Sequence, residues 1–214
     1  EEVKAIFYRV GAEPGDIIFC VADTFKTTCD ALGHLRLELG KRFGLIDEDE
    51  LSFLWVTEFP LLEWDDETQR FYAMHHPFTC PMLEDVPLME TDPGKVRARA
   101  YDMVLNGVEV GGGSIRIHDG ELQEKMFKLL NMTPEEYTEQ FSGLLNAFQY
   151  GAPPHGGLAF GVDRLLMLMA KRETIRDVIP FPKTQSAMDV MMEAPSPVSN
   201  AQLRELHIKL DIKK

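Results

Sequence analysis

Apolar residues alternate with polar ones in some stretches of this chain and recur every three or four residues in others. The first spacing predicts β-strands and the second predicts α-helices. Residues 17–21 form a continuous apolar run of strand length, which predicts a buried strand. Apolar residues then recur at helical spacing, so a helix is expected to begin at Thr24 or Thr27 and to end near Arg42, before Gly44. The start of the chain is therefore expected to hold one strand and one helix.

Two further runs predict a hairpin. Residues 51–59 alternate enough to form a strand that Pro60 ends, and residues 70–74 form a second strand. The polar stretch 63–68 between them is expected to be the turn. Residues 80–94 are rich in proline and acidic side chains, which indicates a loop.

The clearest local signal is the dipeptide Asn106-Gly107 between the apolar runs 99–105 and 108–118. This dipeptide favours a type I′ turn, which needs a positive φ at both positions, so a second hairpin is expected here. Counting outward from the turn makes Asp102 and Glu109 diagonal neighbours on one face of the hairpin.

Two neighbouring carboxylates such as Asp102 and Glu109 repel each other and are costly to bury without a cation or a shared proton. A hard divalent metal, held partly by these oxygens, would remove the repulsion. The alternative is a solvated sheet face that carries two incidental acids.

The run Gly111–Gly113 weakens a strand, so it predicts a bulge or the close approach of a flat ligand to the backbone. Strict alternation would place Arg116 on the face opposite Glu109. A bulge at the glycines is therefore required if Arg116 and Glu109 are to reach one pocket.

The pair His75-His76 follows a predicted strand and precedes Pro77. Adjacent side chains of an extended chain point in opposite directions, so both histidines face one pocket only if the chain bends. A structural role for the pair is the alternative. Two helices are expected later, one capped by Asp119 and one opened by a capping box at Thr133, and both are typical of core packing.

A short buried strand, Gly157–Phe160, is expected to turn at Gly161 into an apolar helix that begins about Val162. Arg164 falls in the first turn of that helix. Its guanidinium suits a planar anion or a phosphate, because it donates several hydrogen bonds at once. The alternative is that Asp163 and Arg164 cap the helix or pair with each other.

Length and charge narrow the class of protein. The 214 residues suffice for one sizeable core, or for one domain and part of another. The net charge of −13 argues against a nucleic-acid-binding module taken by itself, because phosphate contacts need Lys and Arg. Residues 1–150 carry 13 basic and 28 acidic side chains, net −15, whereas residues 151–214 carry nine and seven, net +2. Any contact with a polyanion is expected to be local or to lie outside this chain.

The compartment predicted from the sequence is the cytoplasm. No apolar run reaches the roughly 18 residues of a membrane span, and residues 1–4 do not resemble the start of a signal peptide. The three cysteines, Cys20, Cys29 and Cys80, show no metal-ligand spacing and are odd in number, which indicates a reducing compartment.

Four stretches together carry a resemblance to a known family. Gly157–Leu165 (GLAFGVDRL) resembles the third signature motif of class II aminoacyl-tRNA synthetases. The stretches His75–Thr79, Tyr101–His118 and Gln202–His207 narrow the resemblance to bacterial-type aspartyl-tRNA synthetases, and it covers essentially the whole chain.

The resemblance implies a set of site residues. Arg164 would contact ATP phosphates, and Arg116 would bind the side-chain carboxylate of aspartate; both are the catalytic candidates. The residues implied to bind ATP are Glu109, Gly161, Val162, Asp163 and Arg164. Aspartate would be bound by His75, His76 and Arg116, and Mg²⁺ by Asp102 and Glu109.

The resemblance also implies a fold and a reaction. The fold is α+β, an antiparallel sheet flanked by helices, with residues 49–214 as the C-terminal part of the catalytic domain. Residues 1–48 would be the C-terminal part of an inserted α+β domain. The reaction is ATP-dependent activation of L-aspartate and its transfer to tRNA, by an enzyme that is a homodimer at full length and does not use a membrane.

The chain departs from the family pattern, because the first two class II motifs and the anticodon-binding domain are missing. It is therefore expected to be the C-terminal part of a longer protein and inactive alone. Two alternatives remain open: a related class II synthetase such as an asparaginyl enzyme, and a non-catalytic module that binds an amino acid.

Overall fold

The computed structural model describes residues 2–211 and divides into two compact units, Glu1–Glu50 and Leu51–Lys214. The division lies close to the boundary expected after residue 48. That the first unit belongs to an inserted domain stays a prediction.

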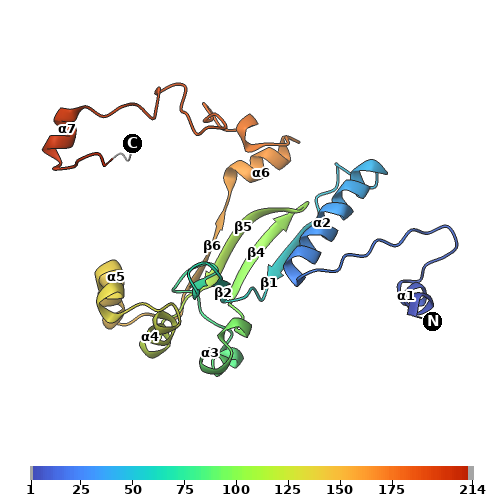
Figure 1. The fold of residues 1–214 in the computed structure, drawn as a ribbon, viewed down its shortest axis with the longest axis horizontal. Coiled ribbons are helices and arrows are strands. Elements are labelled where there is room, and N and C mark those ends of the chain that lie inside the picture. Colours follow the sequence, from blue (N-terminus) through green and yellow to red (C-terminus); the bar gives the residue numbers. More distant parts are fainter. Residues whose placement is uncertain (1, 212–214) are drawn as a thin grey trace. The chain divides into compact units, whose positions relative to one another are not determined.

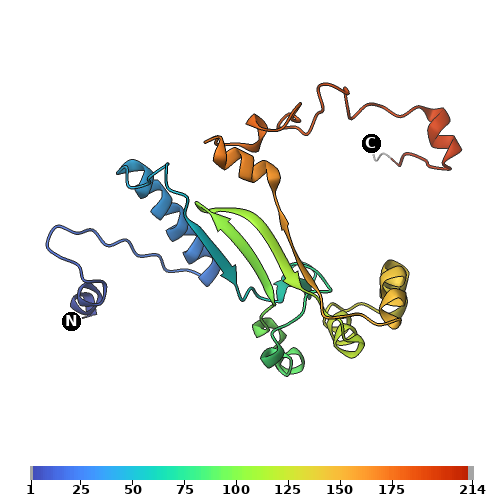
Figure 2. The same ribbon diagram turned by 180° about the vertical axis from the view of Figure 1, so that it is seen from behind.

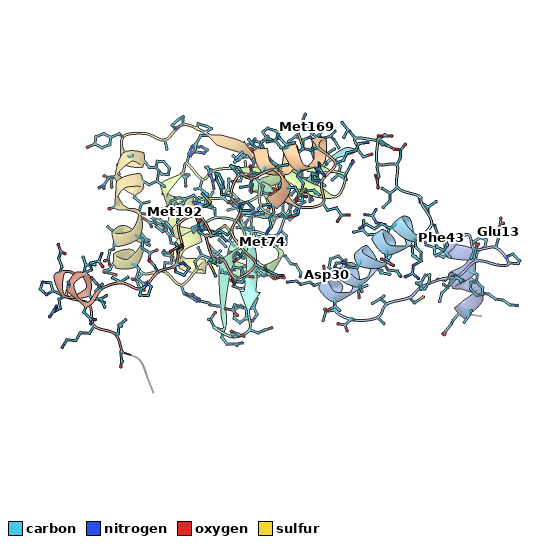
Figure 3. All side chains as sticks on the ribbon, turned by 90° about the horizontal axis from the view of Figure 1, so that it is seen from above. Glu13, Asp30, Phe43, Met74, Met169 and Met192 are labelled. Atoms are coloured by element: carbon cyan, nitrogen blue, oxygen red, sulfur yellow. The ribbon has the colours of Figure 1, made fainter. Side chains whose placement is uncertain are left out.

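The first unit contains α1 (Glu2–Val10) and α2 (Phe25–Arg42). The helix expected in this region is confirmed: Thr24 caps α2, its Oγ1 accepting a hydrogen bond from the Thr27 N–H at 3.4 Å, and Phe43, labelled in Figure 3, ends it. The strand expected at residues 17–21 is wrong. The chain is not helical there, but no strand among residues 2–211 pairs with it, and an apolar run forms a β-strand only when a partner completes its backbone hydrogen bonds.

The second unit is built on a four-stranded antiparallel sheet in the order β1-β4-β5-β6, visible in Figures 1 and 2. Its strands are β1 (Phe53–Thr57), β4 (Ala100–Leu105), β5 (Val108–Ile115) and β6 (Gly156–Phe160). Helices α4 (Gly120–Leu129) and α5 (Pro134–Gln149) lie at one end of this sheet, and α6 (Val162–Met169) lies at the other (Figures 1 and 2). The expected fold class, an antiparallel sheet with flanking helices, is confirmed.

The first predicted hairpin is wrong in its pairing. The stretch expected to be a turn contains a strand, β2 (Leu62–Asp65), which pairs with β3 (Arg70–Ala73), while β1 pairs with β4. Trp64 stands opposite Phe71 in this hairpin, with ring centroids 5.0 Å apart, so an aromatic cross-strand pair stabilises it. Met74, labelled in Figure 3, follows the end of β3, and its N–H donates to the Leu61 carbonyl at 3.1 Å.

The core lies where the β2–β3 hairpin, short helical turns and α4 meet the sheet. The segment expected as a loop contains three such turns, η1 (Leu83–Asp85), α3 (Leu88–Thr91) and η2 (Pro93–Lys95). The buried cluster consists of Leu61, Leu62, Cys80, Met89, Val96, Ala98, Ala100, Ile117, Met126 and Leu130.

Local capping signals are confirmed. Asp119 Oδ1 accepts the Leu122 N–H at 2.8 Å at the start of α4, and Thr133 and Glu136 form the capping box of α5. The remaining helices are η3 (Ile175–Asp177) and α7 (Asn200–Glu205). None of the described helices is both long and apolar enough to cross a membrane.

The strand and helix expected from Gly157 onward are also present, as β6 and α6. The expectation that this strand is buried is wrong, since all five residues of β6 are exposed. β6 is an outer strand of the sheet, and within the described residues only β5 pairs with it.

Candidate functional site

The site is organised by the turn between β4 and β5. Asn106 and Gly107 have φ values of 49° and 81°, the two positive angles that a type I′ turn requires. Leu105 pairs with Val108, as counting from the turn predicts. The hairpin inferred from this dipeptide is confirmed.

A bulge in β5 sets which side chains share a face. Val104 pairs with Glu109, but the next pair is Met103 with Gly111, so Val110 is an extra residue on the β5 side. A bulge of this kind shifts the alternation by one residue. The bulge that the sequence required at the glycines is therefore present, one residue ahead of them.

The turn puts two carboxylates on one face of the hairpin, and the bulge places a glycine beside them. Asp102 pairs with Gly112, and a Cβ on Gly112 would lie 2.5 Å from Asp102 Oδ1 and 3.6 Å from Glu109 Oε1. The Asp102 carboxylate thus occupies the space that a side chain at Gly112 would fill, and the Glu109 carboxylate borders that space. Alternation from Gly112 places Arg116, four residues on, along the same face.

The electrostatics of this pair suit a cation. Burial, and then the negative charge of Glu109, raise the pKa of Asp102, while the nearby His75 partly offsets the rise. Carboxylate oxygens are ligands that Mg²⁺ uses, together with water and phosphate oxygens. Among residues 2–211 no cluster of three or more His, Cys, Asp or Glu side chains is placed to hold a metal. Asp102 and Glu109 therefore fit a cation whose other ligands come from water or from a bound molecule.

The two histidines have different neighbours, although the chain bends after β3. The His75 ring packs edge-on against Phe59, with centroids 4.8 Å apart, and its charge acts on Asp102. The Nδ1 atom of His76 accepts the Phe78 N–H at 3.1 Å. Burial, and then the positive charge of Arg116, lower the pKa of His76.

Backbone hydrogen bonds hold the histidine segment, residues 75–78, beside the end of β5. The Ile117 N–H donates to the Phe78 carbonyl at 2.8 Å, and the Cys80 N–H donates to the Ile115 carbonyl at 2.9 Å. These bonds bring His76 close to Arg116. The structure thus places His75 near the carboxylates and His76 near the arginine.

The start of α6 is hydrogen-bonded to the bulge in β5. The Gly161 N–H donates to the carbonyl of the extra residue, Val110, at 2.9 Å. Arg164 Nη1 donates to the Glu109 carbonyl at 2.9 Å and lies 3.4 Å from Glu109 Oε2. Arg164 is therefore joined to Glu109. Its neighbours Val162 and Asp163 are exposed in the first turn.

Two features of the site carry no signal in the sequence. Phe59, which supports His75, reads as an ordinary apolar residue before a proline. Arg97 donates to Asp85, Glu58 and Glu84 at 2.8, 2.8 and 3.1 Å, and Asp85 is buried. These contacts join residues 12 to 39 positions apart, so no local pattern announces them.

Arg164 contacts Glu109, whose carboxylate lies beside that of Asp102, and strand alternation places Arg116 farther along the same face of the sheet. These residues form a row of positive, negative and positive groups. The arginines suit anionic groups, and the carboxylates suit a hard cation. This row therefore suits a ligand with phosphates and a second ligand with a carboxylate, held for a reaction between them.

Known proteins and a family model match most of this chain. Residues 16–185 match the family described as tRNA synthetases class II (D, K and N). An aspartate–tRNA(Asp/Asn) ligase of Thermoanaerobacter sp. strain X514 is 58% identical over 99% of this chain and 36% of its own length. An aspartate–tRNA ligase of Porphyromonas gingivalis is 60% identical over 98% of this chain and 36% of its own length.

Among solved structures, an aspartyl-tRNA synthetase of Entamoeba histolytica matches 88% of this chain and 32% of its own, with 23% identity and a TM-score of 0.49. The chain spans a little over a third of the length of the curated relatives. The family match covers most of the chain, and the relatives match nearly all of it. The chain belongs to the class II tRNA synthetases of the D, K and N group.

Proposed function

We propose that this chain is part of an aspartate–tRNA ligase. In this reaction the α-carboxylate of aspartate attacks the α-phosphorus of ATP, pyrophosphate leaves, and the aspartyl group of the adenylate passes to the 3′ end of tRNA. The names and the 58–60% identity of the relatives support this function. The observation that carries the proposal is the convergence of Asp102 and Glu109 over Gly112.

Residues at the β5–α6 junction would bind ATP. Arg164 presents a guanidinium, and Val162 and Asp163, which follow Gly161 in the first turn of α6, present backbone N–H groups; both kinds of group bind phosphate. Asp102 and Glu109 would hold Mg²⁺ alongside the nucleotide, where the ion neutralises phosphate charge. Because Arg164 contacts Glu109, its guanidinium is oriented beside the proposed Mg²⁺ site.

Residues at the other end of the row would bind aspartate. Arg116 would pair with the side-chain carboxylate, and its fork can donate two hydrogen bonds to it. His76 Nδ1 accepts a backbone N–H, which leaves Nε2 as the donor of the neutral ring. The lowered pKa of His76 keeps that ring neutral at pH 7. His75 would complete the pocket from the carboxylate side.

Catalysis of this kind depends on position and on charge neutralisation, so it needs no nucleophile from the protein. tRNA would be bound by the longer protein, since this chain carries a net charge of −13. A homodimer is expected for that longer protein. The cytoplasm is expected as its compartment, in keeping with free thiols at Cys20, Cys29 and Cys80.

Pyrophosphate exchange tests the proposal. The intact protein, at the length of the curated relatives, is expected to exchange labelled pyrophosphate into ATP when aspartate is present. Exchange with asparagine but not aspartate would favour the asparaginyl alternative. Failure to exchange with either would favour a non-catalytic module that binds an amino acid. The 214-residue chain alone is expected to show no exchange.

A further inference from the structure

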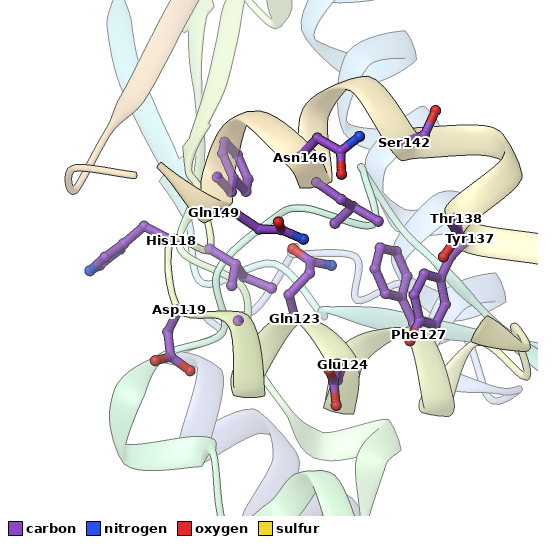
Figure 4. A pocket seen from close by; sticks show the side chains of 14 residues that line it. His118, Asp119, Gln123, Glu124, Phe127, Tyr137, Thr138, Ser142, Asn146 and Gln149 are labelled. Carbon is purple, nitrogen blue, oxygen red and sulfur yellow. The ribbon is translucent and has the colours of Figure 1, made fainter. Parts of the chain in front are cut away.

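Gln123 is a polar residue among the buried residues of α4. Its side chain is 4% exposed, and Figure 4 shows it rising from α4 on the same side as Phe127, whereas Glu124 points away. The other buried residues of this helix, Met126 and Phe127, are apolar. Burying an amide is costly unless it is hydrogen-bonded, so the contact that Gln123 makes indicates its role.

The Gln123 amide holds one peptide group of the histidine segment. Its Nε2 atom donates to the Pro77 carbonyl at 2.9 Å. The Phe78 N–H, on the opposite side of the same planar peptide, donates to Nδ1 of His76 at 3.1 Å. Hydrogen bonds therefore run from Gln123 through this peptide to the ring of His76.

The orientation of this peptide decides which tautomer His76 adopts. With the N–H toward Nδ1, that nitrogen is an acceptor, so the proton of the neutral ring is on Nε2. If the peptide turned over, its carbonyl would face the ring and would require a proton on Nδ1. Gln123 favours the first orientation, because its Nε2 is a donor that pairs with the carbonyl oxygen of a peptide and not with the N–H.

The same stretch of chain sets His76 beside Arg116. After Arg116 the chain continues through Ile117 into α4, which carries Gln123. The Ile117 N–H donates to the Phe78 carbonyl at 2.8 Å, so this stretch holds the histidine segment at two points. The positive charge of Arg116 acts on His76, which shows that the two side chains are neighbours.

We propose that Gln123 is a positioning residue, which orients the Pro77–Phe78 peptide and thereby keeps the proton of His76 on Nε2, beside Arg116. The Nε2–H group and the guanidinium are then two donors for one anionic group. The assignment of the tautomer depends only on the hydrogen bonds described above. Its effect on aspartate binding rests on the function proposed above, in which His76 and Arg116 both bind aspartate.

The tautomer is measured by ¹⁵N NMR of the intact protein at neutral pH, with labelled histidine and with His76→Gln to assign the signals. Nδ1 is expected to be the unprotonated nitrogen of His76 in the unsubstituted protein. Gln123→Met keeps the length of the side chain but removes its donor, so the His76 signals are expected to move toward those of a mixture of tautomers. Gln140→Met makes the same change at an exposed position of α5 and is the matched control, with His76 signals expected to stay in place.

Steady-state kinetics of the intact protein test the effect on aspartate. Gln123→Met is expected to raise KM for aspartate about three- to tenfold, as for the loss of one hydrogen bond. KM for ATP is expected to change less than about twofold, because the hydrogen bonds of Gln123 lead to the aspartate end of the site. A general loss of structure would not separate the two substrates in this way.

A proton on Nδ1 of His76 in the unsubstituted protein would overturn the inference, and this measurement does not depend on the folding of any variant. Unchanged His76 signals in Gln123→Met would also overturn it and would make Gln123 a packing residue. Equal increases in KM for aspartate and for ATP would overturn the effect on aspartate binding. A change of tautomer in Gln123→Met, in a protein that exchanges no pyrophosphate, would confirm the positioning of His76 and overturn the proposed function alone.

Discussion

The carboxylates of Asp102 and Glu109 lie side by side over Gly112, although a hairpin turn separates the two acids in the chain. The register set by the turn puts both acids on one face of the hairpin, and the bulge places Gly112 opposite Asp102. A glycine at the facing position leaves the space that the Asp102 carboxylate occupies and the Glu109 carboxylate borders. The role of Gly112 can be tested by substitution.

Gly112→Ala is expected to displace Asp102 without unfolding the chain. The new Cβ would lie 2.5 Å from Asp102 Oδ1, which is the end of a side chain that can rotate away. The free energy of unfolding is therefore expected to change by less than about 1 kcal/mol. Affinity for Mg²⁺–ATP is expected to fall about tenfold, or roughly 1.4 kcal/mol, measured by calorimetry on the intact protein. Gly120→Ala, whose Cβ meets nothing within 4 Å, is the control, and equal affinities would remove Asp102 from the site.

Gly113→Ala is expected to destabilise the sheet, because its Cβ would overlap the backbone carbonyl of Gly157 on β6. Backbone atoms cannot rotate away, so a loss of more than about 2 kcal/mol in the free energy of unfolding is expected from urea denaturation. Gly157→Ala, on the facing strand, adds a Cβ into open space and is expected to change stability by less than about 1 kcal/mol. Similar losses in both variants would contradict the close approach of β5 and β6.

The pKa of Asp102 is expected to respond to its neighbours in opposite directions. Burial and Glu109 raise it above the ordinary value of 3.8, so Glu109→Gln is expected to lower it, whereas His75→Gln is expected to raise it further. Because the folded chain holds this proton more tightly than the unfolded chain, stability falls as pH rises from about 3.8 through the folded pKa. Carboxyl NMR titration of the unsubstituted protein and the two variants measures these shifts. A pKa of Asp102 that is the same in all three would show that neither neighbour acts on this carboxyl.

The stabilising contact of Arg97 with Asp85 is expected to be lost in acid. Hydrogen bonds from Arg97 hold the pKa of Asp85 below its ordinary value of 3.8, so this contribution to stability is present above pH 3.8 and is lost as pH falls through the folded pKa. Arg97→Met is expected to lower the free energy of unfolding at pH 7, and the difference from the parent chain is expected to shrink in acid. Lys95→Met removes only an exposed pair with Asp92 and is expected to have a small effect at both pH values. A difference independent of pH would assign the effect of Arg97 to packing.

Arg116 is expected to set the preference for aspartate over asparagine. The two amino acids have nearly the same shape, but a carboxylate accepts two hydrogen bonds from the guanidinium, whereas an amide accepts one and turns an NH₂ group toward it. Arg116→Leu in the intact protein is therefore expected to lower kcat/KM for aspartate at least about 30-fold more than for asparagine. Arg116→Lys keeps the charge but loses the fork, so it is expected to fall between the two. Equal losses for both amino acids would make Arg116 a structural residue.

The sequence by itself determined the features that rest on contacts within a few residues. Asn106 and Gly107 favour their turn through their own backbone preferences, and Asp119 and Thr133 cap helices through hydrogen bonds to N–H groups three residues ahead. Strand alternation also predicted that Arg116 and Glu109 could share a pocket only if a bulge lay near Gly111, and a bulge is present there. Such interactions join residues close in sequence, so the rest of the chain is not needed to bring the partners together.

Tertiary structure decided which segments became partners. The apolar run 17–21 has strand composition but finds no partner strand in the described chain, and β1 pairs with β4, 43 or more residues away in sequence, in place of the strand that follows it. The placing of His75 near Asp102 and of His76 near Arg116 likewise arises only when distant segments come together, as does the pairing of Arg164 with Glu109. The physical reason is that a strand, or a charged side chain, is stabilised by whichever partner the whole fold brings within reach, and its own sequence does not specify that partner.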